Sequence, residues 1–207
     1  MNQTTVIETG ENTYKLQVAD DIRHYDRVTS ILKPLINYHG DNEFAKQRGT
    51  AVHYATALLD GLDGKSLAWE SVPEELEGYL AGWLKFKKEC GFDPTGIEKL
   101  VYHPKYQYAG RIDRTGILGE TPVLLDIIAG APTPLKGVQL AAYLYALKWY
   151  TPHFRHAKLF GVSLNAEGGY LLFPDNKGGF NPQKNWELFK CCISINNWRG
   201  TTYGTEY

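Results

Sequence analysis

The sequence has few cysteines and no long apolar run. Its three cysteines, Cys90 and the adjacent Cys191 and Cys192, include no C-x-x-C pair, which argues against a disulfide framework, a zinc ribbon and a four-cysteine metal cluster. No apolar run approaches the ~20 residues that a membrane-spanning helix needs, and residues 1–14 lack the pattern of a signal peptide. We therefore expect a protein that works in a reducing cytoplasm.

The chain also has no excess of charge of either sign. Its 22 lysine and arginine residues and 23 aspartate and glutamate residues give a formal net charge of -1. A polyanionic partner such as DNA would therefore require basic side chains gathered in one place. A chain of 207 residues that is 43% hydrophobic is long enough for one core. Because no repeat, low-complexity tract or linker divides it, we expect residues 1–207 to form a single domain.

The pattern of apolar and turn-forming residues predicts alternating strands and helices. The first part is expected to contain two short strands about a turn at 10–12, a short helix interrupted near Pro34, and a longer helix at 42–60. The next segment, 71–91, has a proline near its start, glutamates in its first turns and lysines in its last turns. This distribution of charge matches the helix dipole and predicts a second long helix.

Residues 96–128 change to three strands joined by short turns at "PKYQ" and "GET". A helix at 138–150, a hairpin with strands at 157–165 and 168–174, and a closing helix at 181–198 are expected to follow. This order predicts an α/β fold in which helices flank a mixed central sheet, with a C-terminal hairpin and helix.

Two aspartates lie on neighbouring strands of this predicted meander. Because side chains two residues apart on a strand point to the same face, Asp126 shares a face with position 128. The antiparallel meander can set the carboxylate of Asp113 beside that of Asp126. Two carboxylates that close repel each other unless a divalent cation lies between them.

The flanking helices add an imidazole and a pair of polar side chains. His53 lies on the helix predicted at 42–60, and Gln139 and Tyr143 are spaced i, i+4 on one face of the helix predicted at 138–150. One imidazole and two carboxylates suit Mn²⁺ or Mg²⁺, hard or borderline ions that keep several waters and accept phosphate oxygens. These residues therefore predict a divalent-metal site that can receive a phosphate group.

Four short motifs occur in a fixed order: "RGTAVH", "AGRID", "LLDII" and "QLAAY". The set resembles the RecB-like, phage-type branch of the PD-(D/E)XK nuclease superfamily, whose pattern is a helical His, then G-x-x-D, then D-x-K, then Q-x-x-x-Y. The resemblance spans about residues 28–147 and implies a restriction-endonuclease-like fold with an αβββαβ core.

The resemblance also implies roles for individual residues. The implied metal ligands are His53, Asp113, Asp126 and the backbone carbonyl of Ile127. Gln139 and Tyr143 would sit beside the scissile phosphate or orient the motif strands. Glu98 resembles an acidic residue that is often found near such centres.

The sequence departs from the family pattern at Ile128, which stands where the family has its lysine. In the family, that ammonium positions the attacking water and offsets charge on the phosphorane, and loss of one such donor typically costs ~10²–10³ in rate. Three explanations stay open. The lysine has migrated, with Lys136 as the nearest candidate and Arg111 as a second; or the chain carries a deliberate Lys-to-Ile change; or the natural protein binds DNA and no longer cuts it.

From this resemblance we expect a metal-dependent exonuclease that hydrolyses linear duplex or single-stranded DNA. Its setting would be phage recombination or DNA processing in the host cytoplasm, together with recombination partner proteins. The alternative is a non-catalytic DNA-binding pseudo-nuclease that retains the fold. A third hypothesis, an α/β domain that recognises a protein or a metabolite, requires all four motif matches to be chance.

The charged candidates also have a purely structural interpretation. Taken alone, His53 fits a partly buried structural histidine as well as it fits a ligand. Asp113 could pair with Arg111 or Arg114 on a solvated strand. The structural interpretation is weakest for Asp126, which ends a buried strand where an unpaired carboxylate is costly.

Gln139 and Tyr143 fit ordinary helix packing, with their polar groups satisfied by water, as well as they fit a site. The remaining histidines show no ligand spacing and are expected at the surface or in loops: His24, His39, His103, His153 and His156.

Overall fold

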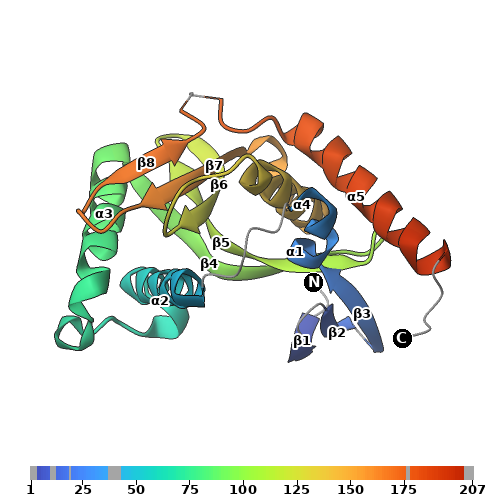
Figure 1. Ribbon diagram of the computed structural model, residues 1–207, viewed down its shortest axis with the longest axis horizontal. Coiled ribbons are helices and arrows are strands. Elements are labelled where there is room, and N and C mark those ends of the chain that lie inside the picture. The colour runs from blue at the N-terminus through green and yellow to red at the C-terminus, as the bar shows by residue number, and fades with distance from the viewer. Residues whose placement is uncertain (1–3, 10–12, 19, 37–42, 176–177, 203–207) are drawn as a thin grey trace.

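In the computed structural model of the protein, the described residues are 4–9, 13–18, 20–36, 43–175 and 178–202. They form an α/β fold in which an eight-stranded mixed sheet is flanked by helices (Figure 1). The arrangement is consistent with a restriction-endonuclease-like fold and confirms the predicted fold class. Every helix within these ranges is too short or too polar to span a lipid bilayer.

The strands are β1 Thr4–Thr9, β2 Thr13–Val18, β3 Asp21–Arg27, β4 Phe92–His103, β5 Tyr108–Leu118, β6 Thr121–Ile128, β7 Lys158–Leu164 and β8 Tyr170–Phe173. The α-helices are α1 Val28–Ile31, α2 Glu43–Leu59, α3 Glu74–Cys90, α4 Leu135–Tyr150 and α5 Pro182–Thr202. Single turns of 3-10 helix are η1 Lys33–Leu35, η2 Leu62–Gly64, η3 Trp69–Ser71 and η4 Pro152–His156. Figure 1 shows the long β4–β5 hairpin across the middle of the molecule, with α2 and α3 toward one end and β1 to β3 toward the other.

The sheet is organised around β5, which has β4 along one whole edge. On the other edge, β3 pairs with β5 in parallel at Tyr108 and Ala109, whereas β6 pairs antiparallel from Arg114 to Leu118. Between these segments, residues 110–113 pair with neither strand in the described chain. The two neighbours therefore diverge here, and we call residues 110–113 the fork.

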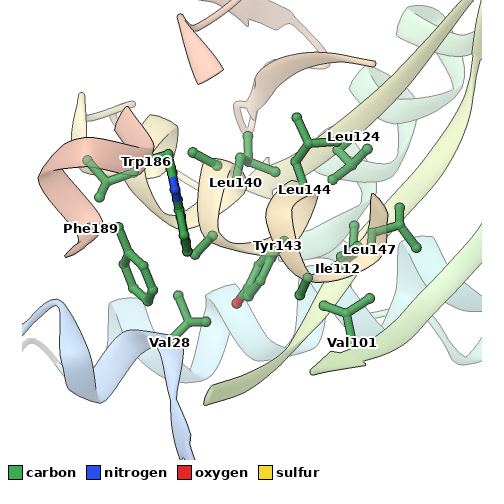
Figure 2. Packing of buried hydrophobic residues seen from close by; sticks show 14 of the residues in the cluster. Val28, Val101, Ile112, Leu124, Leu140, Tyr143, Leu144, Leu147, Trp186 and Phe189 are labelled. Atoms are coloured by element: carbon green, nitrogen blue, oxygen red, sulfur yellow. The ribbon is translucent and has the colours of Figure 1, made fainter. Parts of the chain in front are cut away.

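The crossover that follows joins two parallel strands. β6 and β7 pair in parallel up to Ile128 opposite Ser163, and α4 between them packs against β4, β5, β6 and β7. Most residues of α4 from Gly137 to Leu147 are buried, including the unbroken run 140–144, as expected of an apolar helix that is covered on most sides. Figure 2 shows this helix between Ile112 and Leu124 of the sheet and Trp186 of α5.

Two hydrophobic clusters lie on opposite faces of the sheet. The first joins α1, α4 and α5 to the strands, and the second joins α2 and α3 to β6 and β7. Along β6, Leu124 belongs to the first cluster and Leu125 to the second, as expected for neighbouring residues of one strand. The fork meets α2 through Asp113 and His53, and the start of α4 lies against Asp126 of the neighbouring strand.

The structure differs from the sequence prediction mainly near the N-terminus. β3 was not predicted, because its sequence "DIRHYDR" is strongly polar and only Tyr25 in it is buried. β4 begins at Phe92, earlier than the expected start near Gly96. The predicted turn at 10–12 lies outside the described residues, and the single-domain organisation stays a prediction.

Candidate metal centre

The fork holds a carboxylate that connects two elements. Asp113 Oδ2 accepts a hydrogen bond from the backbone N–H of Ile127 at 2.7 Å, and His53 Nδ1 of α2 lies 3.3 Å from the same oxygen. The Asp113 side chain is only 12% exposed. The side chain thus takes the place of a backbone carbonyl where β5 and β6 separate, and it faces the imidazole as the sequence predicted.

Glu98 reaches the same point because of an unusual backbone. Its φ is 48°, in the left-handed region that residues other than glycine rarely adopt, although it lies in the middle of β4. The ladder pairs Ile97 and Lys99 with β5 but skips Glu98 between them in the described chain. Such a conformation costs about 1–3 kcal/mol and is concentrated at functional sites.

His53, Glu98 and Asp113 form the group that we call the triad. Each offers one ligand atom, and these atoms all lie within 4.8 Å of one another. Among the described residues, the triad is the one group of at least three histidine, cysteine or acidic side chains whose ligand atoms lie close enough together to hold a metal ion. An imidazole with two partly exposed carboxylates is a donor set that fits a hard or borderline divalent cation such as Mg²⁺ or Mn²⁺.

Asp126 lies next to the triad but is not a member of it. Asp126 is only 2% exposed, and Lys136 Nζ lies 2.8 Å from its Oδ2. Lys136 is thus the charged partner of this buried carboxylate. The sequence assigned Asp126 to the metal, whereas the structure places Lys136 against it. Its role as a ligand stays a prediction.

The charges at the centre perturb one another strongly. Burial alone would lower the pKa of His53, but the charge of Asp113 and its hydrogen bond outweigh burial and raise that pKa to about 9. Burial likewise favours a higher pKa for Asp113, yet the imidazolium lowers it. Burial and then the charge of Asp113 raise the pKa of Glu98. Burial raises the pKa of Asp126 to about 6, although Lys136 opposes that rise. The charge of Asp113 thus adds to the rise in pKa of both Glu98 and Asp126, a repulsion that a bound cation would relieve.

A buried arginine, Arg114, contacts two members of the triad, Asp113 and Glu98. Arg114 is fully buried; its Nε donates to Asp60 Oδ2 at 2.7 Å and its Nη1 donates to the backbone carbonyl of Asp113 at 2.6 Å. The same Nη1 lies 3.4 Å from Glu98 Oε1. The sequence hypothesis paired Arg114 with the side chain of Asp113, but the structure gives that carboxylate to His53 and places it on a largely buried strand.

Asp60, at the end of α2, anchors this arginine. It also accepts a hydrogen bond from Trp83 Nε1 at 3.1 Å and pairs with Lys87, both on α3. Sequence reasoning missed Asp60 because it precedes a glycine-bearing turn, where an aspartate is ordinarily exposed. The one sequence signal was the apolar side of residues 71–91, which includes Trp83 and requires a neighbouring element to cover it.

Ile128 does not contact the triad. It is 8% exposed and its Cδ1 packs toward Gly161 of β7, where an added Cβ would lie 2.8 Å from it. Ile127 contributes its N–H to Asp113, while the predicted role of its carbonyl as a metal ligand stays a prediction. Position 128 therefore supplies packing and no charge.

Gln139 and Tyr143 contact each other, and neither residue lines the cleft beside the triad. Gln139 Nε2 donates to the Tyr143 hydroxyl at 3.0 Å. The Tyr143 ring is buried against Gly110, where an added Cβ would lie 2.3 Å from the ring. This packing agrees with the role of orienting the motif strands, because Gly110 is the first residue of the fork.

Two members of the triad, His53 and Glu98, line a cleft of about 920 Å³ to which α2, the β4–β5 hairpin and the start of α4 contribute. Its basic lining residues are Lys46, Arg111 and Lys136, and Gly49 on α2 also lines it. Nothing lies within 4 Å of where a Gly49 Cβ would stand, so this part of the cleft is open to a ligand. The lining also includes the carboxylates of Asp63 and Glu98, so the cations of the cleft lie among acidic side chains.

The prediction that the other histidines are at the surface or in loops is wrong for His103. This residue is 4% exposed and packs among Tyr106, Trp149 and Trp186, and burial lowers its pKa to about 4. His39 lies outside the described residues. Aromatic packing, which has no local sequence signature, accounts for the error.

None of the protein-family models and none of the curated proteins that were compared with the chain matches it. Membership of the PD-(D/E)XK superfamily therefore stays a prediction that rests on four motifs, and the function has to be argued from the triad and its cleft.

Proposed function

We propose that the protein is a divalent-metal-dependent nuclease that uses Mg²⁺ or Mn²⁺ to hydrolyse phosphodiester bonds of DNA. The observation that carries this proposal is the convergence of His53, Glu98 and Asp113, from three separate elements, beside a cleft that Lys46, Arg111 and Lys136 also line. A structural ion pair would explain the contact between His53 and Asp113. It would not explain why Glu98 adopts a left-handed backbone conformation beside them.

Each part of the centre has a chemical task in this proposal. The triad would hold the ion, which when bound supplies Lewis acidity and a water of lowered pKa. The Ile127 N–H fixes one oxygen of Asp113, and Arg114 fixes the backbone of the same residue. The triad is thereby held in place before substrate arrives, which avoids an ordering cost during the reaction. Basic side chains along the cleft would receive the phosphate backbone.

The finer assignment rests on the sequence resemblance alone. Action as an exonuclease on linear duplex or single-stranded DNA, a place in phage recombination with partner proteins, and the host cytoplasm as location are part of this proposal. The cleft is compatible with each of them, because the backbone phosphates that its cations would contact are common to these substrates.

The test is digestion of labelled linear duplex and single-stranded DNA in Mn²⁺ and in Mg²⁺. Asp113→Asn and Glu98→Gln should each lower the rate by at least the ~10–100-fold that is typical of residues one layer further from a metal. Asp63→Asn is the matched control, because Asp63 also lines the cleft but is exposed and lies outside the triad. Unchanged digestion by Asp113→Asn would remove the proposed centre.

A DNA-binding domain that no longer cuts is the second candidate. The observation that favours it is Ile128, whose buried side chain fills the position where the family carries lysine. This candidate predicts salt-sensitive DNA binding with no cleavage in any divalent ion. Cleavage that appears only after Ile128→Lys would support it, since the ammonium alone would then have been missing.

A further inference from the structure

We propose that Lys136 of α4 supplies the cation that acts on the phosphate, in place of the lysine missing at position 128; this inference rests on the function proposed above. Lys136 Nζ lies 2.8 Å from Asp126 Oδ2, and its side chain is 28% exposed and lines the cleft. The ammonium therefore stands between a buried carboxylate near the end of β6 and the space that a phosphate would enter.

The local helix gives no reason of its own for a lysine here. Lys136 is the second residue of α4, whose N-cap is Pro134, and the first turn contains no acidic residue. A positive charge in the first turn opposes the helix dipole. The stabilising partner is therefore Asp126, which a different element contributes.

The ammonium keeps donors for a second partner. A lysine side chain has three N–H donors, and its contact with one oxygen of Asp126 leaves others available. Lys136 can therefore donate to a phosphate oxygen, or to the attacking water, while it remains beside Asp126. Such a donor would be placed before the substrate binds.

The other basic residues of the cleft are placed differently. Arg111 is exposed, and its charge acts on Glu98 at the rim of the centre. Lys46 has a side chain that is 75% exposed and pairs with Glu43 one helix turn away, at 3.9 Å. Both suit the guiding of a DNA backbone. Lys136 is the least exposed of these cations, and its ammonium contacts a buried carboxylate.

The experiment compares Lys136→Met, Lys136→Arg and the double variant Ile128→Lys with Lys136→Met. With linear DNA and Mn²⁺, Lys136→Met should lower kcat by ~10²–10³, while Mn²⁺ affinity by calorimetry stays within a few-fold of the unmodified protein. Ile128→Lys in the same chain should restore at least tenfold, and Lys136→Arg should retain part of the rate. Lys148→Met is the control, because this lysine lies on α4 over the Tyr145 ring and outside the cleft lining.

The outcomes separate this inference from the proposed function. If Asp113→Asn abolishes cutting while Lys136→Met cuts at the full rate, the inference is overturned and the nuclease proposal stands. If the unmodified protein cuts with no divalent ion, both are overturned. Should Lys136→Met fail to fold, Lys136→Gln carries the same expectation, because its side chain is polar but has no positive charge.

Discussion

At the scale of single residues, the centre is a problem of charge compensation. Three carboxylates, of Glu98, Asp113 and Asp126, share a small volume with the imidazole of His53 and the ammonium of Lys136. In the absence of a metal ion, a proton on His53 supplies part of the missing positive charge. A divalent ion would have to displace that proton.

The pH dependence of stability follows from His53. Its pKa is raised from an ordinary 6.5 to about 9, so its contribution to the free energy of unfolding is fully present below about pH 6.5 and is lost as pH rises through about 9. Urea denaturation in chelator should show this loss in the unmodified protein. In His53→Asn the loss should be absent, and parallel curves for the two proteins would refute the pairing.

Much of the triad could be predicted from the sequence. The resemblance to the nuclease motifs implied that His53 and Asp113 share a metal, and the two side chains lie 3.3 Å apart. Glu98 reaches the triad because of its left-handed φ. The sequence around it does not indicate this conformation, since the residue is not a glycine. Arg114 and Asp60 were not predicted as partners, because their contact joins segments that are distant in the chain.

At the scale of elements, the site depends on the irregular middle of the β4–β5 hairpin. The fork leaves Asp113 without a ladder partner on one edge, and Glu98 interrupts the ladder on the other. The helices, the meander and the C-terminal hairpin follow from apolar periodicity. Apolar periodicity does not predict β3, because this polar strand is stabilised by pairing with its neighbours rather than by burial of its own side chains.

The strain at Glu98 can be measured by comparing two truncations. Both Glu98→Gly and Glu98→Ala remove the carboxylate, but only glycine is free of the steric cost of a φ of 48°. We expect Glu98→Gly to be more stable than Glu98→Ala by about 1–2 kcal/mol in denaturant unfolding. At Lys99 the order should be reversed, because glycine weakens the interior of a regular strand. Equal stability of the two Glu98 variants would show that the strand is not strained.

At the scale of the whole molecule, a buried ionic network joins α2, α3 and β5 behind the triad. Asp60 accepts from Arg114 and Trp83 and pairs with Lys87, and Arg114 in turn holds the Asp113 backbone. The network connects α2, which lines the cleft, and α3 to the strand that carries the carboxylate. The position of the triad is thus tied to the packing of these layers.

Removal of the anchor should therefore be expensive. Asp60→Ala leaves Arg114 buried without its main counterion, and we expect a loss of about 3–5 kcal/mol in the free energy of unfolding. Exposed Glu70 serves as control, and Glu70→Ala should change stability by less than about 0.5 kcal/mol. A loss at Asp60 no larger than that at Glu70 would mean that the network contributes nothing.

The most direct measurement is a crystal structure of the protein soaked in Mn²⁺, with anomalous data recorded near the manganese edge. We predict one anomalous peak within bonding distance of a ring nitrogen of His53 and of carboxylate oxygens of Glu98 and Asp113, and the map would also show whether Asp126 joins them. No peak between these three side chains at saturating Mn²⁺, or a peak only elsewhere in the molecule, would contradict the assignment of the metal centre.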